Sequence, residues 1–210
     1  MDRLELYTRW LASRPAPAEV MAGLHAGFDV VRMSDGGMEA VRTEGRLAAG
    51  GYDEDRAIYD NAAFGAGVAG VEPRTVHLGI DIFAPVGTEA FAPVAGRVHS
   101  FADNANPLDY GPTVILEHTT GALVFYTLYG HLGRESLVGL REGKAFAAGE
   151  RLGWLGAPEV NGGWPPHLHF QVVLDMMHYC GDFPGVFRRS ERDHWKTVCP
   201  DPGPLLGIAP

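Results

Sequence analysis

The sequence has little cysteine, no excess of basic residues and no long apolar run. Cys180 and Cys199 are too few for the disulfide framework of a small secreted domain, so we expect both thiols to be reduced. Lysine and arginine number 17 against 26 aspartates and glutamates, giving a formal net charge of −9. This charge offers no attraction to a phosphate backbone or an anionic lipid surface, so we expect neither nucleic acid nor a membrane as partner.

The absence of a long apolar run indicates where in the cell the protein is expected. No window approaches about 18 uninterrupted apolar residues, the length that a membrane-spanning helix requires. The N-terminus, MDRLELYTRWLASRPAPAEV, also lacks the basic and apolar regions of a secretory signal peptide. We therefore expect a cytoplasmic protein without a transmembrane segment.

What the sequence does contain indicates β structure. Its 46% hydrophobic and 20% charged residues are typical of a globular protein, and 28 glycines and 15 prolines predict many turns and short elements. A length of 210 residues suits one domain with extensions better than two full domains. We predict a mainly β, antiparallel fold.

The first 70 residues differ in texture from those that follow. Apolar residues recur at helical spacing between Leu4 and Leu11, and Pro17 begins a second candidate helix. Residues 45–71 are irregular and partly charged, which is typical of a strap that runs over a domain. We expect residues 1–70 to form short helices and a strap packed on the core.

Residues 71–178 carry the main β pattern. Short β-branched and aromatic runs alternate there with Gly, Pro and Asn, and TTG joins the runs TVILEH and ALVFYTLYGHL as a hairpin connection would. Residues 179–210 are proline-rich and have little periodicity. We expect this extension to lie along the surface, with Phe183, Phe187 and Trp195 as anchors.

Two histidines stand one residue apart in the run HLHF. Side chains alternate faces along a strand, so His167 and His169 share a face at a spacing of about 6.6 Å. Zinc binds histidine nitrogen at about 2.0–2.1 Å, and a catalytic zinc usually has three protein ligands and one open position. The pair therefore predicts half of a zinc site, and further ligands must come from elsewhere.

Candidate partners occur at VHLGID and LYGHL. His77 and Asp81 would lie about 13 Å apart in a straight strand, so sharing an ion requires a bend, which we place at Gly79. His131 ends a core strand, a common position for a side chain that faces a cleft. A lone strand histidine is more often a hydrogen-bonded structural residue, and we interpret the remaining five in that way: His25, His99, His118, His178 and His194.

Four blocks in order, HLGIDIFAPVGTEAFAPVAGRV, YGPTVILEHTTG, YTLYGHL and PPHLHFQV, resemble the lysostaphin-type zinc endopeptidase family. The resemblance covers residues 76–173 and implies the compact antiparallel fold called a duplicated hybrid motif. It implies one zinc ion held by His77, Asp81 and His169.

The same resemblance implies catalytic roles for His131 and His167. The expected reaction is hydrolysis of an amide bond in a peptide or peptidoglycan-like substrate, with a water activated by zinc. One of these two histidines would act as the base and the other would stabilise the oxyanion, and both assignments stay open. The family usually has Glu where Gln171 stands, a departure that affects substrate binding or order around the metal more than metal binding.

A second resemblance leaves two functions open. The segments VNGGWPPHLHFQ, DFPGV and CPDPGPLLGI resemble the peptidase-like middle segment of bacterial proteins that join a phosphotransferase to a class III aminotransferase. The chain is then either an active zinc hydrolase or a catalytically silent zinc-binding or scaffolding module related to that system. Trp164, opposite Tyr110, either forms a wall of a substrate groove or caps the core.

Overall fold

The protein is described by a computed structural model over residues 1–33 and 46–208. Its strands are β1 (Phe28–Val31), β2 (Leu47–Gly50), β3 (Glu54–Asp55), β4 (Arg74–His77), β5 (Ile80–Phe83), β6 (Glu89–Phe91), β7 (Gly96–Asn104), β8 (Gly111–Thr120), β9 (Leu123–Gly130), β10 (Ala145–Phe146), β11 (Arg151–Trp154), β12 (His167–Val173) and β13 (Val186–Arg188). Three α-helices accompany them within the described ranges, namely α1 (Arg3–Ser13), α2 (Arg192–Val198) and α3 (Gly203–Leu206). Short 3₁₀ turns form η1 (Leu24–Ala26), η3 (Ala57–Tyr59), η4 (Ala62–Phe64), η5 (Arg134–Leu137) and η6 (Arg189–Glu191).

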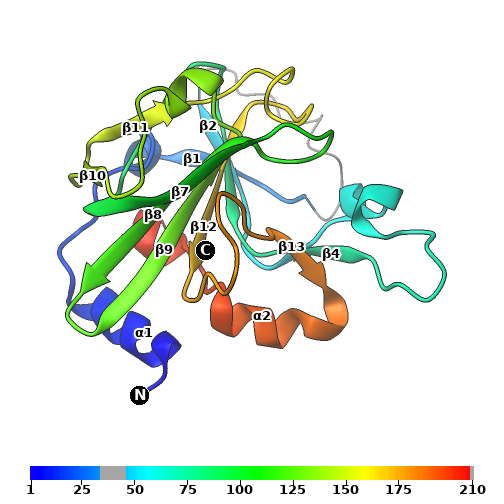
Figure 1. The fold of residues 1–210 in the computed structure, drawn as a ribbon, viewed down its shortest axis with the longest axis horizontal. Coiled ribbons are helices and arrows are strands. Elements are labelled where there is room, and N and C mark those ends of the chain that lie inside the picture. The colour runs from blue at the N-terminus through cyan, green and yellow to red at the C-terminus, as the bar shows by residue number, and fades with distance from the viewer. Residues whose placement is uncertain (34–45, 209–210) are drawn as a thin grey trace.

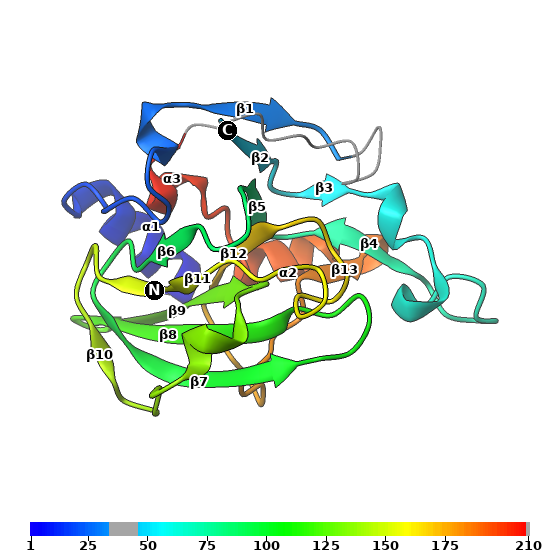
Figure 2. The same ribbon diagram turned by 90° about the horizontal axis from the view of Figure 1, so that it is seen from above.

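One large sheet dominates the molecule (Figure 1). Its strand order is β1-β2-β5-β12-β9-β8-β7-β10, and its neighbours pair antiparallel apart from β1 and β2, which are parallel. Smaller sheets have the orders β13-β4-β3 and β11-β6. Figure 2 shows β5 and β12 in the middle, between β1 and β2 on one side and β7 to β9 on the other. The predicted mainly β, antiparallel fold is confirmed.

The central strand β12 is buried along its whole length. Leu168, Phe170 and Val172 point into the main hydrophobic core. Because side chains alternate along a strand, His167 and His169 lie on the opposite face. The strand therefore separates an apolar core from the polar site described below.

Helix α1 covers the main core beside the β8–β9 hairpin (Figure 1). The Asp2 side chain accepts a hydrogen bond from the backbone N–H of Glu5 and caps the helix. Tyr7 is buried and meets Phe125 edge-on, with ring centroids 5.2 Å apart. The apolar spacing predicted this helix correctly. No helix within residues 1–33 and 46–208 is long and apolar enough to cross a membrane.

The second helix expected from Pro17 does not form. Met21 pairs with Ala90 as an isolated β-bridge, and only the single turn η1 follows. Gly23 and Gly27 flank this turn with φ of 87° and 127°, outside the helical region, so the turn cannot propagate. The local proline signal is outweighed here by pairing with a distant strand.

The segments before and after residues 71–178 contribute regular structure to the fold. The expected strap supplies β2 to the large sheet and β3 to the small sheet. The proline-rich extension supplies β13, α2 and α3, with Phe183 and Phe187 buried in a second core and Trp195 half-buried against it. Edge pairing through backbone groups explains how segments without clear periodicity become ordered.

Candidate metal centre and catalytic cleft

The chain changes sheets between His77 and Asp81. Strand β4 ends at His77 in the three-stranded sheet, and β5 begins at Ile80 in the large sheet. A Cβ atom on Gly79 would lie 2.5 Å from Cε1 of His169, so the close approach requires glycine. The bend predicted at Gly79 is confirmed, and it brings two side chains four residues apart to one point.

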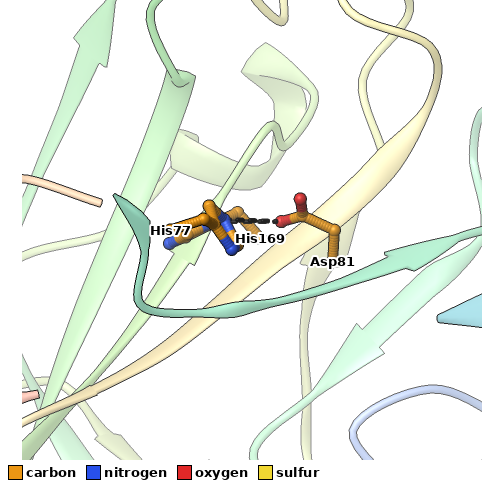
Figure 3. A group of neighbouring side chains, drawn as sticks. All are labelled: His77, Asp81 and His169. Carbon is orange, nitrogen blue, oxygen red and sulfur yellow. Dashed lines mark hydrogen bonds and ion pairs between the residues drawn. The ribbon is translucent and has the colours of Figure 1, made fainter. Parts of the chain in front are cut away.

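Strand β12 supplies the third side chain, because His169 lies opposite Asp81 in the antiparallel β5–β12 pair. Nδ1 of His169 is 3.0 Å from Oδ1 of Asp81 and 2.9 Å from Nε2 of His77. The third distance, from Nε2 of His77 to Oδ1 of Asp81, is 3.3 Å. Figure 3 shows the three side chains facing one another. Ligand atoms about 2.0–2.1 Å from a tetrahedral zinc are roughly 3.3 Å apart, which matches this triangle.

The donor set also fits zinc chemically. Two imidazoles and one carboxylate are common zinc ligands, and all three side chains are buried. Nε2 of His77 faces the other two ligand atoms, while Nδ1 has no hydrogen-bond partner among the described residues. The residues present therefore fit a single zinc ion.

Protonation states favour cation binding as well. Burial lowers the pKa of His77 to about 3, with the charge of Arg56 adding to the effect. Burial raises the pKa of Asp81, but its electrostatic interactions with His77 and Arg56 outweigh this effect and hold the pKa well below its ordinary value. At neutral pH the imidazole is neutral and the carboxylate is ionised, as metal ligands must be.

His131 and His167 lie next to the triangle, with ring centroids 4.1 Å apart. Nδ1 of His131 donates to the carbonyl of Asn161 at 2.9 Å, and Nδ1 of His167 donates to the carbonyl of Pro165 at 2.7 Å. Each ring therefore keeps an unprotonated Nε2. Burial lowers the pKa of both side chains, so both are neutral at neutral pH.

The backbone at His131 is unusual. Its φ is 64°, in the left-handed region that non-glycine residues rarely adopt. Backbone hydrogen bonds hold it there, from His131 N–H to the Tyr110 carbonyl and from Gly156 N–H to the His131 carbonyl, each 2.9 Å long. Such conformations are concentrated at functional sites.

Gln171 determines which nitrogen of His169 faces the triangle. Its amide nitrogen donates to the carbonyl of Pro184 at 3.1 Å and to Sγ of Cys199 at 3.2 Å. The amide oxygen consequently accepts from Nε2 of His169 at 2.9 Å, and Nδ1 keeps its lone pair. Gln171 thus orients the ring of His169.

Sequence reasoning missed Arg56. Its guanidinium is fully buried and pairs with Oδ2 of Asp81, the oxygen that faces away from the histidines. The surrounding DEDRAIYD has the composition of a solvated loop, so no local signal marks this arginine as buried. The contact becomes visible only when β3 is paired with β4.

The five predicted side chains line one cleft of about 350 Å³. Four aromatic side chains form part of its walls, namely Tyr59, Phe64, Tyr110 and Trp164. Charged side chains also line it, namely Arg74, Asp109 and Asp182. Burial, together with the nearby Asp109 charge, raises the pKa of Asp182. The cleft therefore combines aromatic and charged side chains around the five histidine and aspartate residues.

Comparison with known proteins places the chain among peptidases. Peptidase family M23 matches residues 75–179, half of the chain. A comparison with curated proteins finds no significant match. The comparisons give no support to the kinship with phosphotransferase and aminotransferase fusion proteins, which stays a prediction.

The solved structures that the chain matches include two peptidases. A zinc-containing peptidase from Vibrio cholerae is 26% identical, with a TM-score of 0.38 over 47% of this chain and 27% of that protein. The chain thus spans about a quarter of that relative's length. The catalytic domain of the antimicrobial peptidase lysostaphin from Staphylococcus simulans is 24% identical, with a TM-score of 0.45 over 69% of this chain and 86% of that domain.

The family match begins at Thr75 within β4 and extends past β12, so it includes the candidate metal triangle and both neighbouring histidines. The resemblance stated from four sequence blocks is confirmed at the level of the family. This chain belongs to Peptidase family M23, a family of zinc-dependent peptidases.

Proposed function

We propose that this protein is a zinc-dependent peptidase that hydrolyses an amide bond in a peptide held in the cleft. In the proposal, zinc is held by His77, Asp81 and His169, while His131 and His167 act on the proton and the oxyanion. The observation that supports it most directly is the convergence of a three-atom ligand triangle and two neutral imidazoles on one buried cleft.

Bound zinc would polarise the scissile carbonyl and lower the pKa of the attacking water. The unprotonated Nε2 of His131 or His167 takes the proton from that water, since Nδ1 of each ring is already engaged with a backbone carbonyl. The same nitrogen then delivers the proton to the leaving amine. The other imidazole donates to the oxyanion after its Nε2 has taken up a proton from solvent.

The cleft supports a peptide substrate, including a peptidoglycan-like one. Tyr110 packs 5.4 Å from His131 and 5.0 Å from His169 between ring centroids, so it forms a wall beside the reacting atoms. Trp164 and Tyr59 meet edge-on at 6.0 Å and line the cleft too. Aromatic walls exclude water and can pack against a peptide backbone whatever side chains the peptide carries.

The test combines metal analysis with hydrolysis of glycine-rich and peptidoglycan-like peptides. The purified protein is expected to hold one zinc ion and to cleave at least one of these peptides. His131→Ala and His167→Ala should retain zinc and lose about 10²–10⁴-fold in kcat, the usual contribution of a general acid–base. Asp81→Ala should lose the zinc.

His194→Ala is the matched control, because His194 is exposed on α2 and does not line the cleft. It should match the wild type in zinc content and rate. Undiminished hydrolysis by His131→Ala would refute the proposed mechanism. Zinc binding without hydrolysis of any peptide would favour the silent zinc-binding or scaffolding module instead.

A further inference from the structure

Arg56 lies behind Asp81, on the side away from the imidazoles. Its side chain is fully buried, which is rare for arginine without paired charges. Nη1 donates to Oδ2 of Asp81, while Nε and Nη2 both lie 3.0 Å from Oε2 of Glu54. The guanidinium thus joins two carboxylates, and only one of them faces the metal triangle.

We propose that Arg56 is a positioning residue that holds Oδ2 of Asp81 and leaves Oδ1 as the single oxygen available to zinc. The inference rests on the proposed function of the site. Oδ1 is the oxygen that faces the imidazoles, at 3.0 Å from His169, 3.3 Å from His77 and 3.8 Å from His167. Both oxygens of Asp81 therefore have distinct partners.

The reason to fix one oxygen lies in the coordination number. A carboxylate that rotates freely can present both oxygens to a cation and occupy a position that the substrate requires. The planar guanidinium donates in a fixed direction, so it orients the carboxylate more strictly than a water or a lysine would. Arg56 would thus limit Asp81 to one ligand oxygen, so that His77, Asp81 and His169 would each supply one ligand atom.

Glu54 makes this arrangement compatible with a dication. A lone guanidinium next to the site would repel zinc, whereas Glu54, Arg56 and Asp81 together carry a net charge of −1 in a buried cluster. The Glu54 side chain is only 14% exposed, so its charge is poorly screened by water. Arg56 and Glu54 together thus orient Asp81 without repelling the metal ion.

The arrangement comes from outside the segment matched by the family, which begins at residue 75. Strand β3 pairs with β4, with Glu54 opposite His77, and the N–H of Arg56 donates to the carbonyl of Thr75 at 2.9 Å. A Cβ atom on Gly50 would lie 3.0 Å from Nη2 of Arg56, so the backbone is also shaped around the guanidinium. The N-terminal segment therefore completes the metal centre.

The test measures zinc affinity by chelator competition in Arg56→Met, together with the visible spectrum of the Co²⁺-substituted protein. We expect zinc binding to weaken by about 10–100-fold, the usual effect of removing a group that orients a metal ligand. The Co²⁺ spectrum should change, because a second oxygen of Asp81 becomes free to bind. A purely structural role would lower the melting temperature without altering this spectrum.

Arg189→Met is the matched control. Arg189 pairs with Asp55, the neighbour of Arg56 on β3, but its side chain is 67% exposed and does not touch Asp81. It should bind zinc and Co²⁺ as the wild type does. If Arg56→Met does not fold, the Co²⁺ spectrum of Glu54→Gln decides, since the neutral amide oxygen holds the guanidinium less firmly than the carboxylate does. Its zinc affinity should also fall, but the lost negative charge contributes to that change.

The inference would be overturned if folded Arg56→Met had wild-type zinc affinity and a wild-type Co²⁺ spectrum. A wild-type Co²⁺ spectrum in Glu54→Gln would overturn it where that variant decides. In either case the proposed function would remain. A wild-type protein that binds no zinc would remove the proposed function and this inference with it.

Discussion

Both cleft-lining imidazoles on β12 are oriented by a hydrogen bond at the nitrogen that points away from the other cleft histidines. For His169 the acceptor is the amide oxygen of Gln171, and for His167 it is the carbonyl of Pro165. A side-chain amide can be replaced by mutation, whereas a backbone carbonyl cannot. Substitution of Gln171 can therefore test how the hydrogen bond to Nε2 fixes the tautomer of His169.

Gln171→Leu should weaken zinc binding by about 10–100-fold, because Nε2 of His169 loses its acceptor. Gln171→Glu should keep zinc affinity, since a carboxylate also accepts that hydrogen bond. It should nevertheless destabilise the metal-free protein, because the carboxylate cannot donate to the buried carbonyl of Pro184. Chelator competition and thermal unfolding measure the two effects. Equal zinc affinity in Gln171→Leu and the wild type would contradict this role.

Trp164 is buried and belongs to a hydrophobic cluster with Tyr59 and Phe83, while it also lines the cleft. Its burial favours the core-capping interpretation of the sequence. Trp164→Ala should therefore lower the free energy of unfolding by about 3–5 kcal/mol, and Trp164→Phe by less. Denaturant titrations give both values. Unchanged stability with impaired peptide binding would instead assign Trp164 to the substrate groove alone.

At the scale of elements, the hairpin of β8 and β9 carries a buried histidine that has no part in the cleft. Nδ1 of His118 contacts the carbonyl of Ala95 at 2.9 Å, and Nε2 contacts Oγ1 of Thr127 at 2.7 Å. Both ring nitrogens are satisfied, as expected for a structural histidine. A Cβ atom on Gly96 would lie 2.7 Å from the ring, so the adjoining strand β7 is built around it.

His118 should make stability depend on pH. Burial lowers its pKa from 6.5 to about 4, so between these values the unfolded chain binds more protons than the folded protein. The contribution is fully present above pH 6.5 and is lost as the pH falls toward 4, by about 3 kcal/mol in all. Denaturant unfolding of the wild type and His118→Gln at pH 7.5 and 4.5 should show the smaller change in the variant. The same pH dependence in both proteins would argue against a neutral, buried His118.

At the scale of the whole molecule, the metal centre connects two sheets. His77 comes from the three-stranded sheet, whereas Asp81 and His169 come from the large one. The N-terminal and C-terminal segments are tied together beside it, because Asp53 pairs with Arg192 and Lys196 of α2 at 2.7 Å each. A bound ion would therefore couple parts of the chain that pack separately.

Removing the metal should lower the melting temperature of the wild type. Zinc binds the folded state alone in this arrangement, so a free concentration about 100 times its Kd adds about 2.7 kcal/mol to stability. Thermal unfolding with zinc and with a chelator should differ accordingly, and His169→Ala should melt at the same temperature in both. Melting of the wild type that does not respond to zinc would exclude the ion as a link between the sheets.

Local patterns along the chain predicted much of the fold and the face that each histidine of β12 takes, while the family resemblance implied which residues share one zinc ion. Strand alternation put His167 and His169 on one face, turn residues indicated the β8–β9 hairpin, and the strand spacing of His77 and Asp81 required the bend at Gly79. These features depend on contacts within a few residues. The failed helix after Pro17 shows the limit of such patterns, since pairing of Met21 with Ala90 prevailed.

Other features depended on how distant segments pack. Arg56 and Asp81 are 25 positions apart, and Gln171 and Cys199 are 28 apart, so no local pattern signals either contact. The tautomers of the cleft histidines and the burial of Arg56 follow from backbone carbonyls and charges brought together by sheet pairing. Periodicity encodes which face a side chain takes, but its partner depends on the free energy of the whole packed chain.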